Sequence, residues 1–290
     1  MASYQIVTDS STDLPAALAK ELGLVVLPLK FTLEGQTYED FLEGGALTYH
    51  EFYDRLRAGA VSKTAQITLA EFEEAFEKIL AAGQDLLYIG FSSGLSGTYH
   101  CAVLAAEELR GKFPERKIIT LDSLCASMGE GLLVWHACRL RDEGMPLEEL
   151  AAWLKSHKLQ LCHLFTVDDL HFLKRGGRVS PTTAFFGTMM NIKPVLRVDD
   201  EGHLVPLGKA RGRKASLAAL CDQMKALVVS PQEQTVFISH GDCEEDARYL
   251  AELVQSQLGV PRVTIGQIGP VIGSHSGPGT VALFFLGSHR

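Results

Sequence analysis

The chain has 290 residues, of which 46% are hydrophobic and 21% are charged, and its formal net charge is −8. This composition suits one large or two ordinary globular domains, and it makes non-specific binding to nucleic acids or anionic membranes unfavourable. No apolar run reaches the ~18 residues of a transmembrane helix, and the N-terminus lacks the basic and apolar segments of a signal peptide. We therefore expect a cytoplasmic protein without stable membrane insertion.

Six cysteines are spread along the chain, and no two of them form a Cys-x-x-Cys pair. Closely spaced cysteines are the usual signature of a metal site, and disulfides are rare in the cytoplasm. Most of these cysteines fall within strand or helix patterns. We expect free, mostly buried thiols and no metal site.

The first half of the chain alternates strand patterns with helix patterns. Strands are predicted over residues 4–7, 24–33, 86–89 and 117–121, and helices over about 14–22, 48–56, 68–80, 98–110, 126–141 and 146–154. Capping boxes are predicted for Thr48 with Glu51 and for Thr68 with Glu71. Ser11 or Thr12 is predicted to cap the first helix, and residues 61–66 are predicted to form a polar loop. This alternation predicts a parallel sheet covered on both faces, so we expect a three-layer α/β domain over residues 1–158.

The pattern changes over residues 159–290, where we predict a second α/β domain. A strand over 159–166 leads through a short helix over 167–173 to a basic loop over 174–178, and an apolar helix is predicted over 182–190. Runs over 194–198 and 204–207 predict an antiparallel hairpin. Further strands are predicted over 235–239, 262–266 and 281–286, with a helix over 243–258. We expect a mixed or antiparallel sheet with helices against it.

A stretch rich in glycine and serine follows the strand over residues 86–89 and precedes a helix. Free N–H groups at a helix N-terminus and nearby hydroxyls favour a bound anion. Ser92, Ser93 and Ser96 supply hydroxyls there, and Thr64 supplies another from the preceding loop. His275 lies in a predicted glycine-rich loop, where a ligand can approach the backbone closely. We predict that these side chains hold an anion.

Two other functions fit the same stretch. Residues 90–94 match Gly-x-Ser-x-Gly between a strand and a helix, and Asp122 and His275 follow Ser92 in the order of a hydrolase triad. The first alternative is therefore a serine hydrolase of acyl esters. The second is a phosphate- or nucleotide-binding protein, although the chain has no Gly-x-Gly-x-x-Gly or lysine-bearing phosphate loop.

Basic residues gather in two short segments. Lys174, Arg175 and Arg178 lie in a loop with two glycines between the arginines, and Arg211 belongs to a cluster over residues 209–214. Such a loop is either a solvated turn or a place where two guanidinium groups recognise a phosphate or an acidic protein surface. The sequence leaves both interpretations open.

Several stretches together resemble the bacterial DegV family. They are Thr-Asp-Ser-Ser with Asp-Leu over residues 8–14, Ser-Ser-Gly-Leu-Ser-Gly-Thr over 92–98, Val-Asp-Asp-Leu over 167–170, Leu-Lys-Arg-Gly-Gly-Arg over 173–178, Ile-Lys-Pro over 192–194, Lys-Ala-Arg over 209–211, and Gly-Ser-His-Ser-Gly-Pro-Gly over 273–279. The resemblance covers nearly the whole chain in the family's order.

The resemblance implies two domains that bury a long-chain fatty acid, in a protein that needs no cofactor and is not itself an enzyme. It implies that Thr64, Ser92 or Ser93, and His275 hold the carboxylate. The family includes the FakB proteins, which present the carboxylate to a separate fatty acid kinase, FakA, for acyl-phosphate formation and phospholipid synthesis. By this resemblance, Arg178 and its neighbours would face the kinase.

One loop departs from the family pattern. The usual Thr-Ser-Gln-Pro is here Thr-Ala-Gln-Ile over residues 64–67, so Thr64 keeps one hydroxyl while Ala65 and Ile67 remove a second hydroxyl and a proline. Candidates for the lining of an acyl tunnel are Phe185, Phe186, Met189 and Met190, which suit an ordinary core equally well.

Overall fold

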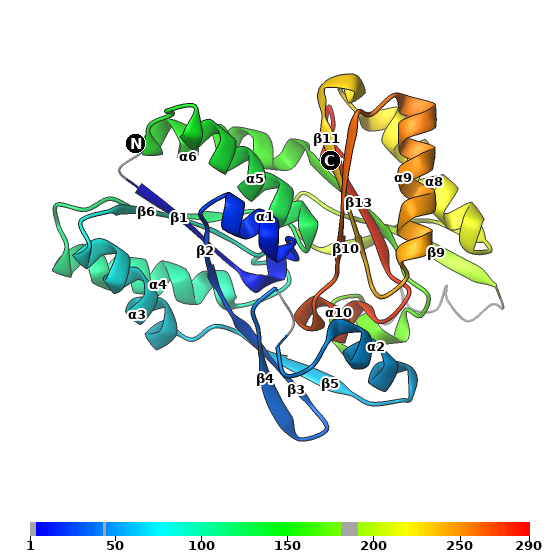
Figure 1. Cartoon of the computed structure of the whole chain (residues 1–290), viewed down its shortest axis with the longest axis horizontal. Helices are drawn as coiled ribbons and strands as arrows, with labels where there is room; N and C mark the ends of the chain where they lie inside the picture. The colour runs from blue at the N-terminus through cyan, green and yellow to red at the C-terminus, as the bar shows by residue number, and fades with distance from the viewer. Residues whose placement is uncertain (1–3, 43–44, 181–190) are drawn as a thin grey trace.

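The computed structural model describes residues 4–42, 45–180 and 191–290 (Figure 1). The helix predicted over 182–190, with Phe185, Phe186, Met189 and Met190, lies outside these residues. No helix within the described ranges is both long and apolar enough to cross a membrane. All six cysteines are free; Cys101 and Cys243 are half-buried and the other four are buried.

A parallel sheet forms the middle layer of the N-terminal half. Its strand order is β2 (Val25–Leu27), β1 (Tyr4–Asp9), β6 (Asp85–Gly90) and β7 (Ile118–Asp122). One face packs against α1 (Ala16–Glu21), α5 (Met128–Asp142) and α6 (Leu147–His157), and the other against α3 (Leu69–Ala81) and α4 (Thr98–Lys112) (Figure 1). Neighbouring residues of β6 face opposite layers: Leu87 and Ile89 face α5, whereas Leu86 and Tyr88 face α3 and α4. The predicted three-layer architecture is confirmed.

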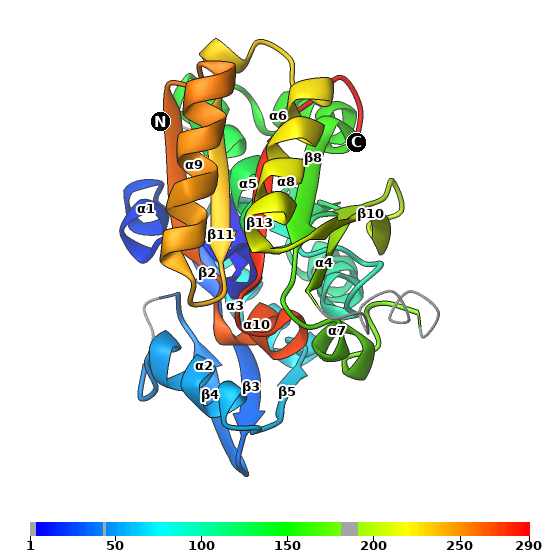
Figure 2. The same ribbon diagram turned by 90° about the vertical axis from the view of Figure 1, so that its right-hand side faces the viewer.

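The second large sheet is mixed. Its order is β10 (Leu204–Arg211), β9 (Ile192–Val198), β8 (Leu161–Thr166), β13 (Val281–Leu286), β11 (Thr235–His240) and β12 (Arg262–Gln267). Only the pair of β11 and β12 is parallel, and the other pairs are antiparallel. Helices α8 (Arg213–Leu227) and α9 (Glu244–Leu258) cover the outer face (Figure 2). The predicted mixed sheet with helices is confirmed.

A third, smaller sheet was not predicted. It joins β4 (Gln36–Asp40), β3 (Leu29–Leu33) and β5 (Ser62–Ala65), with α2 (Tyr49–Arg57) between β4 and β5 in the chain. The single strand predicted over 24–33 is wrong, because it divides into β2 and β3 in different sheets. The polar loop predicted over 61–66 is also wrong. It forms an edge strand that pairs with β3 through backbone hydrogen bonds, which the polar side chains do not reveal.

The predicted starts of the helices agree with the structure in some places and differ in others. The capping boxes of Thr48 with Glu51 and of Thr68 with Glu71 both form. The cap predicted from Ser11 or Thr12 is wrong, because these residues form a separate 3-10 helix, η1 (Ser10–Thr12), and α1 begins after Pro15. The short helix predicted over 167–173 begins later, as α7 (His171–Arg175), and it includes the first two residues of the basic loop predicted over 174–178, so that loop prediction is wrong for these two residues.

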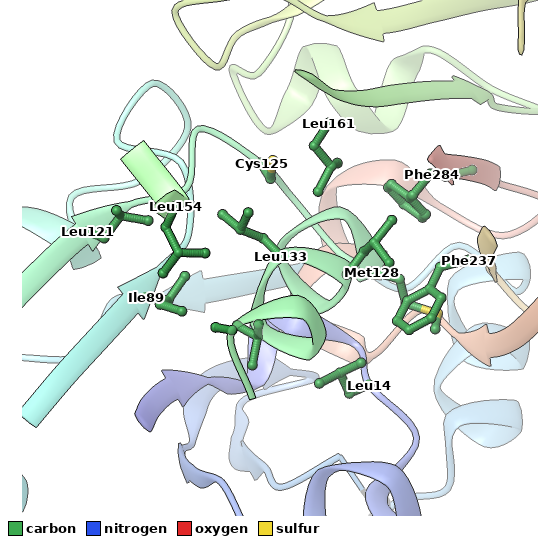
Figure 3. Packing of buried hydrophobic residues seen from close by; sticks show 14 of the residues in the cluster. Leu14, Ile89, Leu121, Cys125, Met128, Leu133, Leu154, Leu161, Phe237 and Phe284 are labelled. Atoms are coloured by element: carbon green, nitrogen blue, oxygen red, sulfur yellow. The ribbon is translucent and has the colours of Figure 1, made fainter. Parts of the chain in front are cut away.

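Helix α5 connects the two large sheets. Its buried side chains, including Met128 and Leu133, pack against Ile89 of the parallel sheet and against Phe237 and Phe284 of the mixed sheet (Figure 3). Both halves therefore share one apolar core through this helix, because α5 is apolar on more than one side.

Among the described residues, four carboxyl groups are buried: Asp9, Asp13, Asp40 and Glu130. Burial raises the pKa of each above its usual value, and raises that of Asp40 to about 6. Hydroxyl and amide donors satisfy most of their oxygens; Tyr88 donates to Asp9 at 2.7 Å, for example. Asp40 Oδ2 has no hydrogen-bond partner among the described residues.

The raised pKa of Asp40 predicts how a neutral variant behaves. Between the unfolded value of about 3.9 and the folded value of about 6, the folded chain binds an extra proton, so stability falls as the pH rises through this window. We expect Asp40→Asn to be more stable than the wild type by about 1–3 kcal/mol near pH 7.5, and the difference to shrink near pH 4. Urea unfolding at both pH values measures this.

Asp200→Asn is the matched control, because Asp200 is exposed at the turn after β9. We expect it to change stability by less than about 0.5 kcal/mol at either pH. An equal effect of Asp40→Asn at both pH values would contradict the assignment.

Candidate functional site

A cavity of about 350 Å³ lies where the two halves of the chain meet. It reaches the lower end of the ~300–1,000 Å³ range of small-molecule sites. Apolar side chains make up much of its wall: Leu29, Phe91, Leu95, Phe165, Leu173, Leu204, Ile268, Val271, Ile272 and Ala282. Polar groups lie at a few points of this wall, so the cavity suits a mainly apolar ligand with a polar group.

Thr64 and His275 meet in the cavity wall. Thr64 Oγ1 lies 2.8 Å from His275 Nε2, and both residues line the cavity. Thr64 is placed by β5, where it pairs with Phe31 of β3. His275 is on α10 (Pro270–Ser276), a helix in a segment that we expected to be a glycine-rich loop, so that expectation is wrong.

Hydrogen bonds hold α10 against the N-terminal half. Gly269 N donates to Asp13 Oδ1 at 2.8 Å, and Tyr53 Oη donates to the carbonyl of Ile268 at 2.8 Å. One helical turn further on, Ser274 Oγ lies 2.7 Å from Ser62 Oγ. These contacts fix the helix at both ends and thereby set the position of His275.

The His275 side chain is neutral at physiological pH. Burial and, to a smaller extent, the positive charges of Arg178 and Arg175 together lower its pKa to about 4. Its Nδ1 has no hydrogen-bond partner among the described residues. The ring packs so closely on Gly176 that a Cβ at that position would overlap Nδ1. The absence of a side chain at Gly176 therefore makes room for the imidazole.

The three serines of the glycine-rich turn lie in different environments. Ser96 lines the cavity, and its hydroxyl lies 3.0 Å from that of Thr98. Ser92 is buried and donates to the carbonyl of Gly202 at 2.9 Å, whereas Ser93 is exposed. Ser92 and Ser93 do not line the cavity. Their part in carboxylate binding stays a prediction, and Ser96 is the serine that reaches the site.

The hydrolase triad is not assembled. Asp122 Oδ1 accepts hydrogen bonds from the backbone N–H groups of residues 93 and 124. The Ser92 hydroxyl is bonded to a backbone carbonyl, and His275 Nε2 is paired with Thr64. Across the described part of the chain, no hydrogen bond joins any two of Ser92, Asp122 and His275. The geometry contradicts the triad alternative, which needs a serine–histidine–aspartate chain.

The basic residues divide between the cavity and the surface. Arg178 is half-buried, lines the cavity and donates from Nε to the carbonyl of Leu95 at 3.1 Å; burial lowers its pKa. Lys174, Arg175 and Arg211 are exposed. The structure thus brings Arg178 beside the polar end of the cavity and leaves the other three residues at the surface.

The sequence analysis missed several wall residues. Ala65 and Gln66 follow Thr64 into the wall, so a methyl group and an amide border the cavity next to the Thr64 hydroxyl. His163 and Phe165 point to the same face of β8, and strand alternation could have placed them together. Ser11 and Ser127 also line the cavity. Their positions in the wall depend on long-range packing, which no local sequence pattern reveals.

One group of possible metal ligands occurs among the described residues. His50, Asp54 and Asp242 place ligand atoms within 4.8 Å of one another. Arg57 donates to Asp242 at 2.5 Å and to Asp54 at 2.9 Å, so both carboxylates are already paired with the Arg57 guanidinium. The group is an exposed ion-pair cluster outside the cavity.

Comparisons with known proteins agree on one family. The DegV family model matches residues 3–288. A DegV domain-containing protein of Clostridium perfringens is 44% identical over 290 residues, which cover 100% of this chain and 99% of the relative.

Solved structures give the same result. A DegV family protein from Thermus thermophilus, described as fatty-acid binding, has 33% identity and a TM-score of 0.89 over 98% of this chain and 99% of its own. DegV from Bacillus subtilis, described as a fatty acid binding protein, has 26% identity and a TM-score of 0.82 over 99% and 100%.

The lowered pKa of His275 predicts its titration. In NMR spectra of the ligand-free protein, the His275 ring signals should titrate with a midpoint of about 4, because burial favours the neutral imidazole. His275→Asn removes the signals and so assigns them. A midpoint at about 6 or above would contradict the described surroundings of the ring.

Proposed function

The chain belongs to the DegV family, and from this premise we propose that it binds a long-chain fatty acid in the cavity, with the carboxylate at Thr64 and His275. The observation that carries the proposal is the pairing of these two side chains in an otherwise mainly apolar wall. Related proteins of known structure are described as fatty-acid binding, which supports the same ligand class.

The polar end offers hydrogen-bond donors to a carboxylate. When a carboxylate replaces the hydrogen bond between them, the Thr64 hydroxyl and the Nε2–H of a neutral His275 can each donate one hydrogen bond to it, and Ser96 lies in the same wall. The guanidinium of Arg178 adds one positive charge there, which favours the ionised carboxylate. Ser92 and Ser93 would join this set only after a rearrangement of the turn.

The acyl chain would supply most of the binding free energy. Burying about 16 carbons at ~0.8 kcal/mol per CH₂ gives roughly 12 kcal/mol before association costs. Hydrogen bonds to the carboxylate add about 1.5–3 kcal/mol each before the cost of desolvation. Affinity therefore depends mainly on the apolar wall, whereas the polar end fixes the direction of the chain.

Lipid analysis tests the proposal directly. We expect mass spectrometry of an organic extract of the purified protein to detect long-chain fatty acids at up to one molecule per chain. Delipidated protein should bind added palmitic acid and, because no triad is assembled, should leave Ser92 unlabelled by a fluorophosphonate. Protein that carries no lipid and binds no added fatty acid would overturn the proposal.

Gly176→Ala tests the position of His275. The added methyl group would displace the imidazole, so we expect palmitic acid affinity to fall about tenfold. Gly111→Ala is the matched control, because a Cβ there meets nothing within 4 Å, and it should leave affinity unchanged. Equal affinity of Gly176→Ala and the wild type would argue against His275 as a carboxylate ligand.

We also propose that the protein presents the bound carboxylate to a partner fatty acid kinase for acyl-phosphate formation. The exposed Lys174 and Arg175 end α7, directly before Gly176, which contacts His275, and Arg178, which lines the cavity. A basic surface next to the carboxylate suits an acidic partner face. The reaction needs ATP, so this proposal places the protein in the cytoplasm.

Charge reversal separates partner binding from lipid binding. We expect Lys174→Glu with Arg175→Glu to lower acyl-phosphate formation by the fatty acid kinase of the same organism at least tenfold, while palmitic acid still binds. Lys20→Glu, an exposed reversal on α1, should have no effect. Full activity of the double variant would place the kinase contact elsewhere.

A further inference from the structure

The cavity wall contains polar atoms that no protein group satisfies. Among the described residues, three cavity-lining side chains each have a buried atom without a hydrogen-bond partner: His163 Nδ1, His275 Nδ1 and Ser276 Oγ. Buried polar groups are normally paired, so each of these requires an explanation. Two of these atoms, in His275 and its neighbour Ser276, are on α10 at the polar end of the cavity, whereas His163 is on β8.

His163 is buried beside two aromatic rings of the mixed sheet. Its ring lies 4.5 Å from that of Phe284 and 5.7 Å from that of Phe165, measured between centroids. Burial lowers the pKa of its imidazole to about 3, so the ring is neutral and has one donor and one acceptor nitrogen. Its Nδ1 makes no hydrogen bond within the described part of the chain.

The sheet register places His163 well away from the carboxylate end. Thr280 Oγ1 donates to the carbonyl of Ser276 at 3.0 Å, next to His275, and β13 begins one residue later. Along β13, His163 pairs with Phe284, four residues beyond Thr280. At ~3.3 Å per residue this separation is roughly 13 Å. An acyl chain that starts at His275 and follows this sheet would pass His163 far from its carboxylate.

We propose that His163 is a specificity-determining residue that recognises an oxygen substituent, a hydroxyl above all, in the middle or distal part of the bound acyl chain. A hydroxyl group can donate to one imidazole nitrogen or accept from the other, which satisfies an atom that an unsubstituted chain leaves unpaired. A site built to hydrogen-bond a hydroxyl discriminates against the analogue that lacks it. This inference rests on the proposed fatty-acid binding and names a class of ligand for it.

A competition experiment tests the inference. Delipidated protein is incubated with equal amounts of stearic acid and a hydroxystearic acid whose hydroxyl lies in the middle of the chain, and the bound acids are quantified by mass spectrometry. We expect the hydroxylated acid to be enriched about tenfold, which corresponds to ~1.4 kcal/mol. Stearic acid with a hydroxyl next to the carboxylate is the control, and it should show no such enrichment.

Two variants locate the effect. His163→Leu removes both nitrogens and should abolish the enrichment, whereas His163→Gln keeps a donor and an acceptor and should retain part of it. Binding of stearic acid without enrichment of the mid-chain hydroxyl in the wild type would overturn the inference, and this comparison does not depend on whether a variant folds. Enrichment that persists in His163→Leu would also overturn it. Failure to bind either acid would instead overturn the proposed function.

Discussion

The placement of α10 against the N-terminal half is the constraint on which the site depends. Asp13 accepts from Gly269 N, and Tyr53 donates to the carbonyl of residue 268, so the start of the helix is fixed from two directions. The helix then places His275 next to Thr64, which belongs to strand β5 of the small sheet. Without these contacts, the cavity would lack its polar end, because neither half of the chain contains both partners.

The buried carboxyl groups belong to the same constraint. Asp13 needs its hydrogen-bond donors, because an unpaired buried carboxyl is costly, and Gly269 and Ser127 supply them from distant parts of the chain. Ser11 and Ser127 meet the buried acids with their hydroxyls and also line the cavity. The packing of the acids and the shape of the ligand site are therefore coupled.

The sequence predicted the elements that hydrophobic periodicity and local capping patterns indicate. The parallel sheet, its helices and the mixed sheet follow from alternating patterns, and the capping boxes follow from local hydrogen bonding. The small sheet was missed because β5 is a polar edge strand whose pairing depends on β3. Thr64, Ser96 and His275 were identified as site residues, and the structure brings all three to one cavity. His163 was missed as a binding residue because strand alternation can place it beside Phe165 but cannot show that its Nδ1 lacks a hydrogen-bond partner.

A crystal structure of the protein with palmitic acid tests the central claim most directly. The account predicts a carboxylate oxygen within about 2.6–3.2 Å of Thr64 Oγ1 and of His275 Nε2, with the acyl chain running along β13 toward His163. A fatty acid bound in the opposite direction, with its carboxylate at His163, or one bound outside this cavity, would contradict the account.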